Sequence, residues 1–164
     1  MIQAKVIREF SQGKHRHSAC IADALTAAEA TCARRGIRLT PTRRRVLELV
    51  WANHEPVKAY DVLDILRTER SSAAPPTVYR ALEFLLEEGL VHKIESLNAY
   101  VGCGKPGHLD SGQFLICGDC GEVAELDDPE LVKLISKKAG QIGFSIEDQV
   151  VEIKGSCAQC TIDK

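Results

Sequence analysis

Four cysteines have the spacing of metal-binding knuckles, because they fall into two C-x-x-C pairs: Cys117, Cys120, Cys157 and Cys160. Four thiolates in two such pairs can close a tetrahedral shell around one zinc ion. Gly118 and Gly121 are expected to let the backbone of the first pair turn tightly enough for both sulfurs to point inward. The spacing therefore predicts a structural zinc site with four sulfur ligands.

A disulfide pair and a thioredoxin-like redox motif are the alternative interpretations of these cysteines. Residues 1–10 contain no apolar run long enough for a signal peptide, which favours a reducing cytoplasm, where lasting disulfides are rare. A redox motif normally occurs once, after a strand and before a helix, whereas this chain has two C-x-x-C pairs. Both observations favour zinc.

A second set of possible ligands lies between the middle of the chain and the first cysteine pair: His92, Cys103, His108 and Glu125. Each of these residues alone is better explained as an ordinary surface or core residue. Together they supply nitrogen, sulfur, nitrogen and oxygen donors, a combination that suits zinc. Three protein ligands plus water would also suit a catalytic zinc, but no general base is evident near Cys103, and we expect no enzyme.

Other histidines and cysteines carry less information. His15 and His17 form an H-x-H pair near the N-terminus, where such residues are usually solvated. Cys20 and Cys32 have no C-x-x-C partner and are interpreted as small core residues or free thiols.

Length and charge suggest two small domains of different character. The chain has 164 residues, 45% of them hydrophobic and 27% charged, and no apolar run long enough for a membrane span. Residues 1–100 carry 15 Lys and Arg against 12 Asp and Glu, whereas residues 101–164 carry 6 against 11, so the net charges of +3 and −5 give the −2 of the whole chain. A basic first half joined to an acidic second half suggests a polyanion-binding module with a separate partner domain.

Hydrophobic periodicity predicts four helices and then a hairpin in the first hundred residues. The helices are expected at 18–35, 41–51, 59–69 and 76–88, and the strands at 90–95 and 99–102. Thr40 and Pro41 form a clear helix start, and Val62, Ile65 and Leu66 are expected to face the core. Short helices followed by a hairpin are typical of a winged helix-turn-helix, whose second helix enters the major groove.

The fourth helix would leave three polar residues exposed at its start: Thr77, Tyr79 and Arg80. Arginine pairs well with the guanine edge, so Arg80 is expected to read bases, whereas Thr77 and Tyr60 are expected to bind phosphate. The alternative for Arg80 is a surface salt bridge to Glu83 or Glu87.

The remainder of the chain predicts a hinge and a small α/β domain. Three glycines and a proline among residues 103–112 indicate a hinge, which is expected to span 101–112. Strands are expected at 113–116, 122–126 and 149–154, with a helix at 129–139. We therefore predict an α+β chain with a winged-helix DNA-binding domain at 1–100 and a dimerisation and metal-binding domain at 113–164. A domain this small would be stabilised by pairing with a second copy.

An ordered set of motifs resembles the ferric uptake regulator (Fur) family, and most of all its zinc uptake regulator branch. The resemblance covers roughly residues 20 to 160 and lies in Thr77-Val78-Tyr79-Arg80, His92-Lys93, Tyr100 to Cys103, the first cysteine pair with Gly121, Val123 and Glu125, and the second cysteine pair. A chain with only five histidines and a thiolate at Cys103 favours zinc over Fe(II) or Mn(II).

The resemblance implies a homodimeric, zinc-responsive transcriptional repressor that binds double-stranded operator DNA in the cytoplasm. It implies about two zinc ions per chain. The four paired cysteines match the structural ligands, and the regulatory ligands would be His92, Cys103, His108 and Glu125, with Asp110 as the substitute for His108. Tyr60 and Arg80 match residues that the branch uses on DNA. The alternative is a regulator of the same family that senses another metal or peroxide.

Overall fold

The computed structural model describes residues 5–11, 17–106 and 112–162. The chain separates into two compact units, which are considered one at a time. The helical unit is Ser11–Leu109, and the sheet unit combines Met1–Phe10 with Asp110–Lys164. Across the described ranges, no helix is both long and apolar enough to span a bilayer. The α+β class predicted from the sequence is confirmed.

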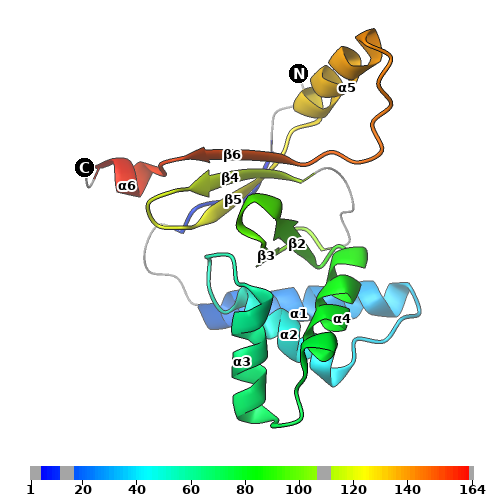
Figure 1. Ribbon diagram of the computed structural model, residues 1–164, viewed down its shortest axis with the longest axis vertical. Helices are drawn as coiled ribbons and strands as arrows, with labels where there is room; N and C mark the ends of the chain where they lie inside the picture. Colours follow the sequence, from blue (N-terminus) through cyan, green and yellow to red (C-terminus); the bar gives the residue numbers. More distant parts are fainter. Residues whose placement is uncertain (1–4, 12–16, 107–111, 163–164) are drawn as a thin grey trace. The chain divides into compact units, whose positions relative to one another are not determined.

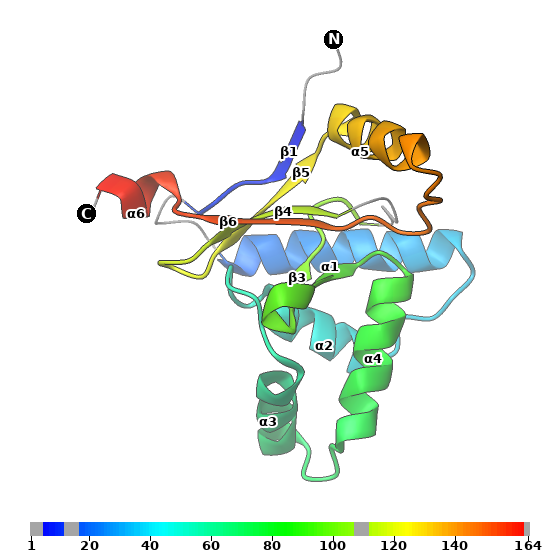
Figure 2. The same ribbon diagram turned by 45° about the horizontal axis from the view of Figure 1, so that its top comes forward.

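The helical unit contains four α-helices and a two-stranded antiparallel sheet (Figures 1 and 2). Its elements are α1 (His17–Arg34), α2 (Pro41–Trp51), α3 (Ala59–Glu69), α4 (Pro75–Glu87), β2 (Val91–Ile94), the 3-10 turn η1 (Glu95–Leu97) and β3 (Ala99–Gly102). Helices α1 and α4 both pack on α2, and α3 packs on α4. The strands β2 and β3 form the wing of a winged helix-turn-helix.

Local capping sets the helix boundaries that the sequence predicts. The Thr40 side chain accepts a hydrogen bond from the Arg43 amide, and Pro41 occupies the first turn of α2. Helix α4 ends before Gly89, which has φ +63°, a conformation that favours glycine. All four predicted helices of this unit are present within one or two residues of the expected ends.

The core of the helical unit confirms most of the predicted buried positions, with one error. Val62 and Leu66 of α3 are buried as expected, but Ile65 is 42% exposed. The adjacent Leu63 is buried in its place. The apolar stripe of α3 therefore follows Ala59, Val62, Leu63 and Leu66, so the prediction for Ile65 was displaced around the helix.

The three arginines that begin α2 are engaged within the helical unit. Arg45 binds both Glu48 and Glu69, and Arg44 binds Glu29 and Glu48. The Arg43 guanidinium lies 3.5 Å from the centroid of the Phe84 ring, a cation–π contact. These arginines hold α1, α3 and α4 against α2.

The sheet unit is a four-stranded sheet with the order β1-β5-β4-β6. Its elements are β1 (Lys5–Arg8), β4 (Gln113–Cys117), β5 (Val123–Asp127), α5 (Pro129–Gln141), β6 (Val151–Gly155) and α6 (Ala158–Ile162). Strand β5 pairs antiparallel with both β1 and β4, whereas β6 pairs parallel with β4. Figure 1 shows β6 as an edge strand of this sheet.

Two elements of the sheet unit have no counterpart in the sequence prediction. Strand β1 comes from the polar N-terminus, and α6 contains Cys160, the last cysteine of the second pair. Residues 5–10 therefore belong to the sheet unit, although the sequence analysis grouped them with the winged helix.

Candidate metal centre and nucleic-acid interface

The parallel pairing of β4 with β6 brings the two cysteine pairs together. Cys117 ends β4 and stands opposite Gly155, which ends β6 two residues before Cys157. Because parallel strands end at the same edge of a sheet, both knuckles leave the sheet side by side. The Gly118 amide donates to the Gly155 carbonyl at 2.8 Å and fixes this alignment beyond the strands.

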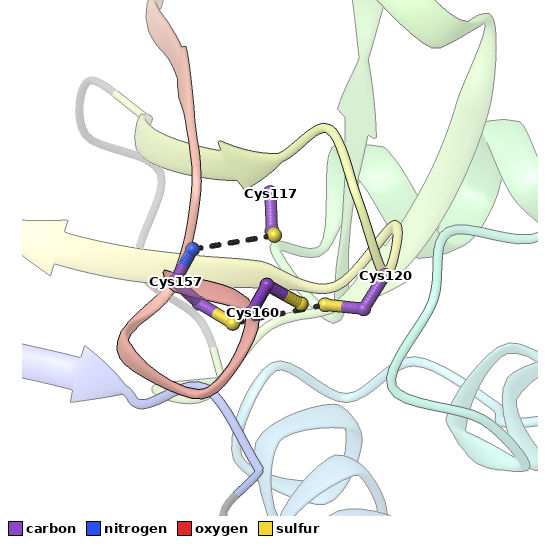
Figure 3. Close-up of side chains that lie close together, drawn as sticks. All are labelled: Cys117, Cys120, Cys157 and Cys160. Carbon is purple, nitrogen blue, oxygen red and sulfur yellow. Dashed lines mark hydrogen bonds between the residues drawn. The ribbon is translucent and has the colours of Figure 1, made fainter. Parts of the chain in front are cut away.

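The four predicted sulfur ligands converge in one cluster (Figure 3). All four Sγ atoms lie within 4.8 Å of one another, and those of Cys120 and Cys157 are 3.9 Å apart. A tetrahedral zinc site with Zn–S bonds of about 2.3 Å has S···S edges of about 3.8 Å. The cluster therefore fits a zinc ion with four sulfur ligands: Cys117, Cys120, Cys157 and Cys160.

Only one of the two glycines in the first knuckle is needed for its conformation. Gly121 has φ +79°, and its amide donates to the Cys117 carbonyl at 3.0 Å. A β-carbon at Gly118 would meet nothing closer than the Gly155 carbonyl oxygen at 3.8 Å, an ordinary contact. The expectation that Gly118 was also required was wrong.

The electrostatics of the cluster prepare it for a cation. Backbone amides, first that of Cys120 and then that of Cys157, lower the pKa of Cys117 to about 6. The Cys157 amide donates to the Cys117 sulfur at 3.3 Å. The neighbouring Cys157 side chain, with burial, raises the pKa of Cys160 to about 12. One thiolate therefore forms readily at Cys117, and a bound cation would favour loss of the proton from Cys160 as well.

Two of the predicted regulatory ligands lie together in the helical unit. His92 is on β2, opposite Val101, and Cys103 directly follows β3. A ring nitrogen of His92 and the Cys103 sulfur lie within 4.8 Å of each other. Cys103 is buried, and its thiol donates to the Lys105 carbonyl at 3.1 Å.

The other predicted regulatory residues are placed differently. Glu125 lies on β5 in the sheet unit, opposite Phe114 of β4. His108 and its substitute Asp110 lie outside the described residues, as does His15.

The four predicted DNA-binding side chains are exposed on the surface of the helical unit. Tyr60 is in the first turn of α3 and is 65% exposed, and Tyr79, near the start of α4, is 46% exposed. Thr77 and Arg80 are also exposed. Arg80 takes part in none of the ion pairs found among the described residues, so the salt bridge that could have explained it is absent there.

Two features of the surface were missed by the sequence analysis. A cavity of about 300 Å³ lies in the helical unit next to Tyr60 and Tyr79, with Lys58 and Lys93 in its lining. A groove of about 650 Å³ in the sheet unit is lined mainly by apolar side chains from α5 and the segment that leads into β6. The cavity is lined by residues dispersed between positions 58 and 100, so no local motif marks it. The groove is lined by residues of the continuous segment 134–151, whose run of apolar residues was the available signal.

Comparison with known proteins identifies the family of this chain. The family model described as "Ferric uptake regulator family" matches residues 34–154. The chain is 44% identical over 139 residues to the zinc uptake regulation protein of Escherichia coli strain K12, which covers 83% of this chain and 80% of that protein. It is 31% identical over 128 residues to a ferric uptake regulation protein of Neisseria meningitidis, covering 76% and 87% of the two chains.

Two solved structures of regulators also match most of the chain. The crystal structure of holo XcZur matches with a TM-score of 0.79 and 42% identity, covering 90% of this chain and 99% of that one. A zinc uptake regulator complexed with zinc and DNA matches with a TM-score of 0.77 and 40% identity, covering 92% and 98%. The chain therefore belongs to the ferric uptake regulator family.

Proposed function

We propose that this chain is a zinc-responsive transcriptional repressor of zinc-uptake genes, which binds a palindromic operator as a homodimer when its regulatory site holds zinc. It is a regulator and not an enzyme, as its family membership indicates. The observation that carries the proposal is the pairing of His92 with Cys103 in a chain 44% identical to a zinc uptake regulation protein. A thiolate and an imidazole favour zinc over Fe(II) or Mn(II).

The chain would bind about two zinc ions, with different roles. The four-cysteine cluster would hold a structural ion, because a closed shell of four protein ligands leaves no position for exchange or chemistry. The regulatory ion would take His92, Cys103 and Glu125, with His108 or Asp110 as the fourth donor. Donors from both units make DNA affinity depend on zinc, and by linkage operator DNA raises zinc affinity by the same factor.

The apolar groove of the sheet unit supports the homodimer. Leu134, Ile142 and Phe144 line it and are 53%, 82% and 63% exposed, which is unusual for large apolar side chains. The adjacent β6 is an edge strand with outward-facing apolar residues, among them Ile153 at 52% exposure. A second copy of the same surface would cover both the groove and the strand edge by a two-fold contact.

The exposed start of α4 supports DNA reading. Arg80 would contact a base edge in the major groove, and Tyr60, Thr77 and Tyr79 would contact the backbone around it. In a dimer, two such helices would match half-sites about one helical turn apart. Zinc can shift the ratio of DNA-competent to DNA-incompetent protein from 1:99 to 99:1 only if it binds the competent form ~10⁴-fold more tightly than the other form. Such a protein would work in the cytoplasm, where operator DNA is accessible and thiols stay reduced.

The test is metal content and DNA binding of the purified protein with free zinc buffered over a wide range. We expect about two zinc ions per chain, one of which mild chelation removes together with operator binding. One inert zinc with metal-independent binding would contradict the proposal. Equal activation by Fe(II) or Mn(II) at their own buffered concentrations would favour a different sensor of the same family.

A further inference from the structure

The cavity near Tyr60 and Tyr79 has the composition of an anion site. It lies in the helical unit and has a volume of about 300 Å³. Its polar lining consists of Lys58, Tyr60, Tyr79, Lys93, Asn98 and Tyr100. These residues come from the starts of α3 and α4 and from the wing, so the cavity opens where two predicted DNA-contacting helices begin.

The floor of the cavity is fixed by backbone pairing. The amide of Val57 donates to the Tyr100 carbonyl at 2.9 Å, and the amide of Tyr100 donates back to the Val57 carbonyl at 2.8 Å. This bridge holds the residue before Lys58 against β3. Lys93 stands opposite Tyr100 in the pairing of β2 with β3. Two lysines are thereby held on the two sides of a buried tyrosine, which is only 7% exposed.

The charges of the lining favour an anionic ligand. A hydrogen bond to Glu95 raises the pKa of Lys93, so its ammonium group stays protonated. Burial raises the pKa of Tyr100, so its hydroxyl remains a hydrogen-bond donor at neutral pH. Glu95 does not line the cavity. Its exposed carboxylate accepts a hydrogen bond from the Lys93 Nζ at 2.8 Å. The lining itself therefore offers two cations and several donors without a carboxylate.

We propose that this cavity binds one backbone phosphate of the operator DNA, with Lys58 and Lys93 as its charged ligands and Tyr100 as its floor. The inference rests on the proposed function and extends it to residues outside the α4 start. A phosphate held here would fix the position of the wing relative to the backbone and thereby orient the start of α4 in the groove. The Glu95 carboxylate competes with the phosphate for Lys93, so it lowers the affinity for DNA.

The experiment compares three variants with the unaltered protein, all zinc-loaded, on two DNA duplexes. One duplex is selected from a random library by the unaltered protein, and the other has the same composition in scrambled order. The variants are Lys93→Gln, Lys58→Gln and Glu95→Gln, and Lys133→Gln on the exposed face of α5 is the control for a change in net charge. Dissociation constants are measured over a range of salt concentrations.

Loss of either lysine should weaken binding to both duplexes by the same factor. It should also reduce the slope of log K against log salt by about 0.9 for each cavity engaged, hence roughly 1.8 for a dimer. Glu95→Gln should bind both duplexes more tightly than the unaltered protein. The control should match the unaltered protein in affinity and slope.

Three results would overturn the inference. One is an unchanged salt slope in Lys93→Gln and Lys58→Gln when the unaltered protein binds DNA normally. Another is a selective loss on the chosen duplex, which would make the lysines base contacts. The third is weaker binding by Glu95→Gln, which would make its ion pair with Lys93 a support of the wing. These results leave zinc-dependent repression intact, whereas absence of any zinc-dependent DNA binding by the unaltered protein would overturn both proposals.

Discussion

The ring of Trp51 packs against the backbone of Gly102. A β-carbon built at Gly102 would lie within 3.0 Å of several indole atoms, closer than real β-carbons approach their neighbours. Trp51 ends α2, and Gly102 ends β3 directly before Cys103. The contact therefore connects the helix-turn-helix core to the strand that leads into a proposed zinc ligand.

Gly102→Ala should destabilise the helical unit, because the new methyl group must displace the indole. Overpacking of this kind typically costs about 1 to 3 kcal/mol of unfolding free energy. Urea unfolding followed by fluorescence measures it, since Trp51 is the only tryptophan in the chain. For the double variant with Trp51→Phe, unfolding is followed by circular dichroism. The smaller ring should restore part of the stability, and strictly additive losses would show that the two residues do not interact.

Cys157→Ser and Cys103→Ser should separate the two zinc sites. Cys157→Ser removes a buried ligand of the four-cysteine cluster and should lose the structural zinc with cooperative folding of the sheet unit. Cys103→Ser should keep that zinc and lose zinc-dependent operator binding. Metal analysis and circular dichroism distinguish the two variants. A Cys103→Ser protein with an unaltered zinc response would show that Cys103 is not a regulatory ligand.

Much of the helical unit could be predicted from its sequence because its signals are local. The start at Thr40 and Pro41 depends on residues that contact each other within one turn. The error at Ile65 arose because α3 contains adjacent apolar residues, so sequence periodicity allowed either Leu63 or Ile65 to face the core. Packing against the other helices, which the sequence does not display, selected Leu63.

The sheet unit was less predictable because its order depends on pairing between distant segments. The two C-x-x-C pairs indicated a shared metal ion, but not that β4 and β6 run parallel to bring Cys117 and Cys157 together. Strand β1 was missed because residues 5–8 gain their strand conformation by pairing with β5, more than one hundred residues later in the chain. Neither relationship leaves a local pattern.

Cys20 and Cys32 should differ in reactivity toward iodoacetamide in the zinc-loaded protein. Burial raises the pKa of Cys32, so it has little thiolate and little access, whereas Cys20 is half-buried. Mass spectrometry at pH 8 should find Cys20 modified and Cys32 intact. Because the pKa of Cys32 is higher in the folded than in the unfolded protein, the folded state keeps its full stability below the unfolded value of 9.0. Above that pH the unfolded chain loses the Cys32 proton more readily, so the free energy of unfolding falls. Rapid labelling of Cys32 at pH 8 would contradict this assignment.

Arg80→Ala should reduce the preference for operator over random DNA by ~1 to 3 kcal/mol per site. The reason is that a bidentate arginine distinguishes guanine from other bases, whereas a phosphate contact does not. Arg44→Ala is the matched control, since Arg44 is already bound to Glu29 and Glu48. Its DNA preference should not change. Equal weakening of Arg80→Ala on both DNAs would assign Arg80 to the backbone.

Phe144→Asp should prevent dimer formation and, with it, operator binding. Phe144 is 63% exposed in the apolar groove of the sheet unit, and a carboxylate there would have to lose its water without gaining a partner. Ile162→Asp is the control, because Ile162 is 78% exposed on α6 but does not line the groove. Sedimentation equilibrium should give a monomer for Phe144→Asp and a dimer for Ile162→Asp, with the structural zinc retained in both. A dimeric Phe144→Asp protein would place the interface elsewhere, because two charges facing each other across a buried two-fold contact could not be accommodated.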